Sequence, residues 1–501
     1  MITDLKALFN DIYNDVFNLL PTSTSIKPVH VANGLGRALV GRTYDSDALA
    51  HFLRRSILNQ KSRVQEERFP NGIILNDYGR AFTGRDSDTV DSDALSTLRS
   101  LAEGVLAADK AVFSDAAQSS YTLSNEKLLT RDPSDHRCGI FLAELLTAGQ
   151  EGDAATHIRD ILLIDDDPWS TLAMPMMQFA QPSKVESVAT SDHGQTTYSP
   201  LTIDATGTIV SPTLRRLRAS LDRLARFEQN SGSKLNSLRR MVMFSCFVIH
   251  VHLISRYSEV VDGAPHPPIL IDMFDGSRTS LRNASRASLR AAGDVLETLI
   301  LRRIRDRISE QVETVGADQM ILNLPARTQQ RIRNGFDAYR HDDQASELEA
   351  ISEAFWQVAT EEKNHPVGFL TELGRRAGYL TPWANSGRGG RLQKRYGITT
   401  EFLETLVAAT VEPDQPLDFP EFLDKLRINY GIVAGQRTDD QIVRHNNLSG
   451  KPFGTPTSVN EEDLRLNVEA LRSAILEAGY AKAYADGQTV ITTDPESLTV
   501  L

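Results

Sequence analysis

Cysteine is scarce in this 501-residue chain, which contains two, Cys138 and Cys246. Two cysteines exclude a disulfide scaffold and a cysteine-rich zinc domain, and they fit a reducing cytosol. Long apolar runs are also few: the longest, residues 241–254, is shorter than the roughly 20 residues that a transmembrane helix needs. The first 20 residues contain four charges and so lack an uncharged signal-peptide core. We therefore predict a cytoplasmic protein that does not engage a membrane.

The common phosphate-binding and catalytic motifs are missing as well. Gly450-Lys451-Pro452 lacks the glycine spacing and the hydroxyl of a P-loop, and Gly34-Leu35-Gly36 lacks the third glycine of a dinucleotide fingerprint. The sequence has no Gly-x-Ser-x-Gly elbow and no His-Glu-x-x-His pattern. We therefore predict no cofactor and no ATP hydrolysis. An enzyme with dispersed catalytic residues stays open, although the sequence favours a non-catalytic protein.

Aspartates at the ends of apolar runs are the best candidates for dispersed chemistry. Asp165 and Asp167 follow ILLI, which is either a short strand or a helix end, and Asp272 follows ILI. Carboxylates at a strand end can bind Mg²⁺, but such residues are more often a solvated loop or a cap. A nuclease would also need Glu-x-Lys on a strand, and the match at residues 361–363 ends a helical pattern instead. We predict no metal site and keep a metal-dependent nuclease as the alternative function.

Two histidines also lie close together in the sequence, His250 and His252. On a helix, residues at i and i+2 point about 200° apart and cannot share a metal ion. The surrounding run has the pattern of a helix, so we interpret both as core or interface histidines.

Apolar residues make up 41% of the chain and charged residues 24%, which is ordinary globular composition. The periodicity is mostly helical, so we predict a mainly α, multidomain fold with small β-hairpins at 201–210 and 480–492. The predicted parts are an N-terminal helical domain (1–185), a central helical domain with a buried helix at 241–254 (195–345), a basic winged-helix-like region (346–440) and a C-terminal helix with a hairpin wing (455–501).

The winged-helix interpretation rests on capping and turn signals. Ser458-Val459-Asn460-Glu461 is a capping pattern, and the helix that follows is ended by Gly479. A hairpin with a turn at Asp486-Gly487 comes next. Helices followed by a hairpin are typical of a winged helix-turn-helix, and we predict C-terminal winged-helix-like modules.

Positive charge is concentrated in a few segments, whereas the chain as a whole has a net charge of -12. Such a molecule is not a general nucleic-acid binder, so any contact with DNA must come from a basic patch. The segment 374–396 contains no acid, interleaves aromatic residues with glycines, and has these cations: Arg375, Arg376, Arg388, Arg391, Lys394 and Arg395. Guanidinium groups can bind phosphates in a bidentate manner. We predict DNA binding by this segment on a solvated face; the alternative is a surface loop whose aromatics close a small core.

A second basic feature is the arginine stripe Arg282, Arg286 and Arg290. The i, i+4, i+8 spacing places all three on one face of a helix. Like charges at this spacing favour an anionic partner, which is either phosphate or an acidic face of another subunit.

Two stretches, Arg395 to Gly435 and Pro267 to Leu289, resemble segments of poorly characterised accessory proteins of bacterial anti-phage defence systems, which accompany ATPases or nucleases. The resemblance covers about a fifth of the chain and carries over no functional residue. It implies a DNA-sensing or scaffolding subunit with an ATPase or a nuclease as partner, and an oligomer is compatible with it. We therefore predict a non-catalytic subunit of a bacterial nucleic-acid-handling complex.

Overall fold

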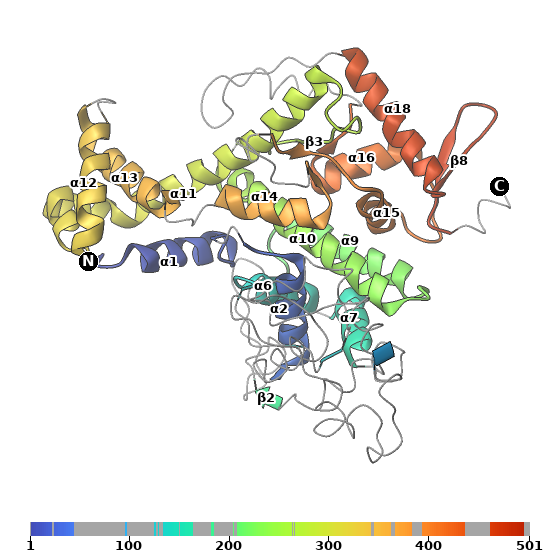
Figure 1. Cartoon of the computed structure of the whole chain (residues 1–501), viewed down its shortest axis with the longest axis horizontal. Coiled ribbons are helices and arrows are strands. Elements are labelled where there is room, and N and C mark those ends of the chain that lie inside the picture. The colour runs from blue at the N-terminus through green and yellow to red at the C-terminus, as the bar shows by residue number, and fades with distance from the viewer. Residues whose placement is uncertain are drawn as a thin grey trace. The chain divides into compact units, whose positions relative to one another are not determined.

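The computed structural model describes a large part of the chain, and its helical character confirms the predicted mainly α class (Figure 1). The described residues are 2–22, 25–44, 96–97, 125–126, 129, 134–149, 151–163, 182–184, 204, 208–262, 264, 266–341, 345–361, 366–382, 393–435 and 461–494. The chain forms two compact units, one of residues 1–26, 210–217 and 246–501 (unit 1) and one of residues 27–209 and 218–245 (unit 2). The four sequence-based domains stay a prediction.

Unit 2 contains α2 (Pro28–Val40), α6 (Cys138–Thr147) and α7 (Asp153–Leu163), and β1 (Arg42–Tyr44) pairs antiparallel with β2 (Pro182–Lys184). Glycines let α2 and α6 pack closely: a Cβ on Gly139 would lie 2.0 Å from the carbonyl carbon of Gly34. The Gly34-Leu35-Gly36 motif therefore serves helix packing. The apolar run before Asp165 ends a helix, and Asp165 and Asp167 lie outside the described residues.

Two helices, α9 (Pro212–Glu228) and α10 (Lys234–Val260), contribute residues to both units. Every residue of the predicted buried helix 241–254 is buried, which confirms that prediction. Among the described helices, α10 alone is long and apolar enough to cross a membrane, and 89% of its most apolar window is buried. The hairpin predicted at 201–210 lies largely outside the described residues.

Unit 1 begins with α1 (Leu5–Phe17) and is organised around the long helix α11 (Thr279–Leu322), which is kinked at Gly316. The helices α12 (Ala326–His341) and α13 (Glu347–Glu361) pack beside the second half of α11 (Figure 1). The first half of α11 packs against β3 (Ile269–Leu270) and β5 (Arg395–Tyr396). Ser285 Oγ donates a hydrogen bond to Tyr396 O over 3.1 Å, which anchors β5 on this helix.

The rest of unit 1 alternates short strands with helices. These are α14 (Pro366–Ala377), β4 (Leu380–Thr381), α15 (Thr400–Thr410), β6 (Leu417–Asp418), α16 (Phe419–Tyr430), β7 (Ile432–Val433), α18 (Glu461–Glu477), β8 (Ala481–Ala483) and β9 (Thr489–Ile491). Strand β4 pairs antiparallel with β5, and β3 pairs parallel with β7. The third sheet has the order β6-β9-β8 and is antiparallel. It contains the β8–β9 hairpin predicted within 480–492.

Candidate anion-binding site

The two basic features of the sequence meet at one cavity of unit 1, which we call the arginine pocket. It has a volume of about 510 Å³ and is lined by Asp275, Gly276, Arg282, Arg286, Pro382, Gln393 and Arg395. Ligand sites in proteins typically have volumes of about 300–1,000 Å³. Arg282 and Arg286 come from the first turns of α11, and Arg395 comes from β5. Residues of the stripe and of the 374–396 segment therefore share a cavity.

Arg395 is held by two aspartates of very different exposure. Its Nε donates to Oδ2 of Asp272 over 2.7 Å, and its NH2 group donates to Oδ1 of Asp275 over 2.6 Å. The Asp272 side chain is 0% exposed, whereas that of Asp275 is 87% exposed. The buried carboxylate thus orients the guanidinium, while the exposed one lies at the pocket wall.

Arg282 and Arg286 of α11 add two positively charged groups to the cavity that Arg395 lines. Arg282 donates from NH1 to Gly276 O over 3.3 Å, and its buried Nε has no hydrogen-bond partner. Burial, and then the charges of Arg290, Arg282 and Arg395, lower the pKa of Arg286. Arg290 itself is exposed one turn further along α11 and does not line the pocket. An anion bound here would relieve the repulsion among these groups.

The turn over Arg395 is a part of the site that sequence reasoning missed. Asp275 and Gly276 have φ values of 47° and 80°, in the left-handed region. A Cβ on Gly276 would lie 2.9 Å from Arg395 Cζ, so only glycine allows this approach. The adjacent Asp-Gly pair is the sequence signal that could have indicated the turn.

The other cations of the 374–396 segment lie elsewhere or outside the described residues. Arg375 and Arg376 on α14 both pair with the buried carboxylate of Glu372, at 2.6 and 3.5 Å. Lys394 is 2% exposed and donates to Pro382 O, and burial lowers its pKa. Arg388 and Arg391 are not among the described residues.

The expectation that this segment lies on a solvated face is wrong for Lys394 and Arg395. Arg395 is 5% exposed, about as little as Lys394. Both are buried because each has an internal acceptor, a backbone carbonyl for Lys394 and the Asp272 carboxylate for Arg395.

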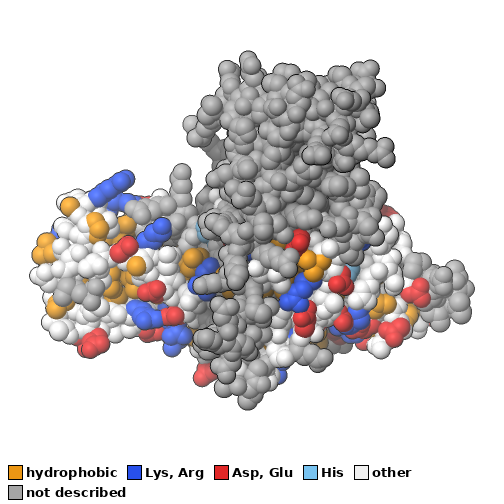
Figure 2. Space-filling view, turned by 90° about the horizontal axis from the view of Figure 1, so that it is seen from below, with side chains coloured by type: hydrophobic (Ala, Val, Ile, Leu, Met, Phe, Trp, Pro, Cys, Tyr) orange, Lys and Arg blue, Asp and Glu red, His pale blue; other side chains and the backbone are white. Residues whose placement is uncertain are grey.

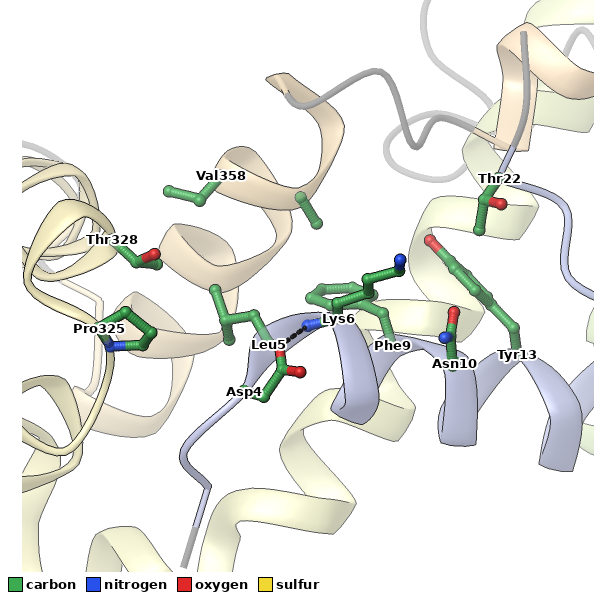
Figure 3. Close-up of a pocket in the computed structure, with 11 residues that line it drawn as sticks. Asp4, Leu5, Lys6, Phe9, Asn10, Tyr13, Thr22, Pro325, Thr328 and Val358 are labelled. Carbon is green, nitrogen blue, oxygen red and sulfur yellow. Dashed lines mark hydrogen bonds between the residues drawn. The ribbon is translucent and has the colours of Figure 1, made fainter. Parts of the chain in front are cut away.

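A second cavity of unit 1, of about 110 Å³, contains none of the predicted site residues (Figure 3). Lys6, Phe9 and Tyr13 of α1 form one wall. The Tyr13 hydroxyl is buried without a hydrogen-bond partner, and burial raises its pKa. The cavity is smaller than a typical ligand site, and its lining has no cluster of like charges.

Metal chemistry finds no support in the described part of the chain. No group of three or more His, Cys, Asp or Glu residues there could hold a metal ion. Asp272 is bound to Arg395, and residue 361 ends helix α13. His250 contacts the Tyr396 hydroxyl at 2.8 Å, whereas His252 contacts Phe17 O at 2.9 Å. Both are buried, so of the two predicted environments, core or interface, they occupy the core.

Comparison with known proteins adds no family to this picture. No protein-family model matches the chain, and no curated protein matches its sequence. The resemblance to defence-system proteins therefore stays a prediction. The geometry of the arginine pocket is the observation from which a function can be inferred.

Proposed function

We propose that the chain is a non-catalytic subunit of a bacterial nucleic-acid-handling complex and that the arginine pocket binds phosphates of the nucleic-acid backbone. The observation that carries this proposal is that Arg282, Arg286 and Arg395 line one cavity. Guanidinium groups match phosphate geometry and make hydrogen bonds about twice as strong as neutral ones. The buried Asp272 carboxylate holds Arg395 in place before any ligand arrives, which reduces the entropy lost on binding.

We propose that the contact with nucleic acid is confined to the arginine pocket and does not extend over a larger surface. In Figure 2, basic and acidic side chains are interspersed over the described surface of the face shown, without one extended basic patch. The net charge of -12 also opposes a long contact with a polyanion. We expect few phosphate contacts and an affinity that falls with salt.

The connectivity of residues 400–491 supports the winged-helix part of the proposal. The order is α15, β6, α16, β7, α18 and the β8–β9 hairpin; β6 joins the hairpin in one sheet, whereas β7 pairs with β3 outside this set. Figure 1 shows α15, α16, α18 and β8 together near the C-terminal end of the chain. A helix, a strand, two helices and a hairpin are the parts of a winged helix-turn-helix. We propose one such module drawn from both predicted C-terminal regions, in place of two.

The charge of α18 favours a protein partner for this module over DNA. Its acidic residues are Glu461, Glu462, Asp463, Glu469 and Glu477, against the basic Arg465 and Arg472. Both arginines pair with glutamates three residues before them. A helix of this charge would be repelled by phosphates in a DNA groove. We therefore propose that α18 serves the scaffolding role, toward an ATPase or a nuclease.

Fluorescence anisotropy with labelled DNA at several salt concentrations tests the pocket. An Arg282→Ala/Arg286→Ala variant should lose most of the binding, and its log–log salt slope should flatten by about 2 units. The matched control is Arg302→Ala/Arg303→Ala, which removes two positive charges from α11 outside the pocket. Equal losses in both variants, or no binding of the unchanged protein at low salt, would refute the proposal.

A further inference from the structure

The two ion pairs of Arg395 differ in how easily a ligand can replace them. Asp272 is buried, and separating it from Arg395 would leave two uncompensated charges away from water. Asp275 is 87% exposed, and its carboxylate can return to water at little cost. Asp275 is therefore the replaceable partner.

Asp275 also shares the pocket with three arginines. Among the described residues that line the cavity, it is the one carboxylate beside Arg282, Arg286 and Arg395. Its φ of 47° and the left-handed Gly276 behind it aim the carboxylate at Arg395. Burial, and then repulsion from Arg290, Arg282 and Arg395, lower the pKa of Arg286 in the presence of this carboxylate.

We infer that the ligand group of the arginine pocket is a phosphate that displaces the Asp275 carboxylate from Arg395, so that Asp275 is an internal competitor that sets the affinity. A phosphate has several anionic oxygens and can contact Arg395 together with an arginine of α11. The Asp275 carboxylate is tethered to its turn and is bonded to Arg395. This inference rests on the proposed anion site, but it does not require that the phosphate belong to nucleic acid.

The test compares Asp275→Asn with the unchanged protein. Asparagine tolerates the left-handed backbone and removes the charge. The matched control is Asp318→Asn, because Asp318 is 73% exposed and pairs with Arg333 at 2.9 Å, and the net charge changes equally. Inorganic phosphate is titrated by calorimetry, and labelled single-stranded and duplex DNA by anisotropy. Asp275→Asn should bind phosphate about two- to fivefold more tightly, whereas Asp318→Asn should not.

The outcomes separate this inference from the proposed function. If Asp275→Asn binds phosphate as the unchanged protein does, or more weakly, Asp275 positions Arg395 and the inference is wrong. If phosphate binding tightens but no variant binds DNA, the inference stands and the nucleic-acid function fails. If DNA binding depends on Arg282 and Arg286 but Asp275→Asn does not bind phosphate more tightly, the nucleic-acid function stands and the inference about Asp275 fails. Should Asp275→Asn fail to fold, Asp275→Gly, which suits the positive φ, takes its place.

Discussion

Arg395 on β5 and Asp272, which follows β3, form a buried ion pair with an Nε to Oδ2 distance of 2.7 Å. The two residues are 123 positions apart in the sequence. The backbone supports the same junction, because Asp272 N donates to Tyr396 O over 2.9 Å. The pair thus fixes β5 beside the first turns of α11 and so assembles the arginine pocket.

Loss of this pair should destabilise the protein more than loss of its exposed counterpart. Asp272→Asn leaves the buried Arg395 guanidinium with the exposed Asp275 as its remaining carboxylate partner, which we expect to cost up to about 3–5 kcal/mol. Asp275→Asn removes the exposed partner and should cost less than about 1 kcal/mol. Urea unfolding of both variants measures the difference. Similar midpoints for the two would contradict the assigned roles.

Acid should destabilise the fold through the core histidines. Burial lowers the pKa of His250 to about 3 and that of His252 to about 4. An unfolded histidine has a pKa near 6.5, so between about pH 4 and 6.5 the unfolded chain binds more protons. Stability should therefore fall as the pH drops through this window, by at least about 2 kcal/mol between pH 7 and 4.

Unfolding at a series of pH values measures this slope. The variant His250→Phe keeps an aromatic ring beside Phe247 and Tyr379 but cannot be protonated, so its slope should be shallower even though it loses the bond to Tyr396. His341→Gln, at the exposed end of α12, is the control and should keep the slope. An unchanged slope in His250→Phe would count against the assignment.

Unit 2 should be sensitive to a single methyl group between α2 and α6. Gly139→Ala would place its Cβ 2.0 Å from the Gly34 backbone, so the helices must separate. Overpacking of this kind costs about 1–3 kcal/mol. Gly232→Ala is the control, since nothing lies within 4 Å of its added Cβ. Thermal unfolding should show a lower Tm for Gly139→Ala alone, and equal Tm values would disprove close packing.

Arg388 and Arg391 should add to polyanion binding, as the sequence predicts. In the sequence they lie between Pro382 and Gln393, two residues that line the pocket. Replacing both by alanine should weaken DNA binding for all sequences alike and flatten the salt slope by up to about 2 units. Arg395 is left intact in this variant, because its removal would leave the buried Asp272 carboxylate without its ion-pair partner. If the double variant keeps the salt dependence of the unchanged protein, Arg388 and Arg391 do not contact phosphates and this prediction is wrong.

Local signals in the sequence were sufficient to predict several helices and the β8–β9 hairpin. Apolar periodicity predicted the buried helix within α10, and spacing predicted that Arg282 and Arg286 share a face of α11. Capping and turn residues predicted α18 and its hairpin, because helix ends and tight turns depend on neighbours in the chain. The mainly α class follows from such signals.

The site itself depended on tertiary structure. Composition identified 374–396 as a basic segment, but it could not predict that Arg395 forms an ion pair with Asp272 or that Arg375 forms one with Glu372. The choice between a buried and a solvated cation is made by carboxylates and carbonyls that folding brings near, and the partner of Arg395 is far away in sequence. The sequence by itself determined which residues carry charge and which segments form helices. Only the packing of β5 on α11 decided which of those charges face one cavity, because electrostatic neighbours are set by distance in space.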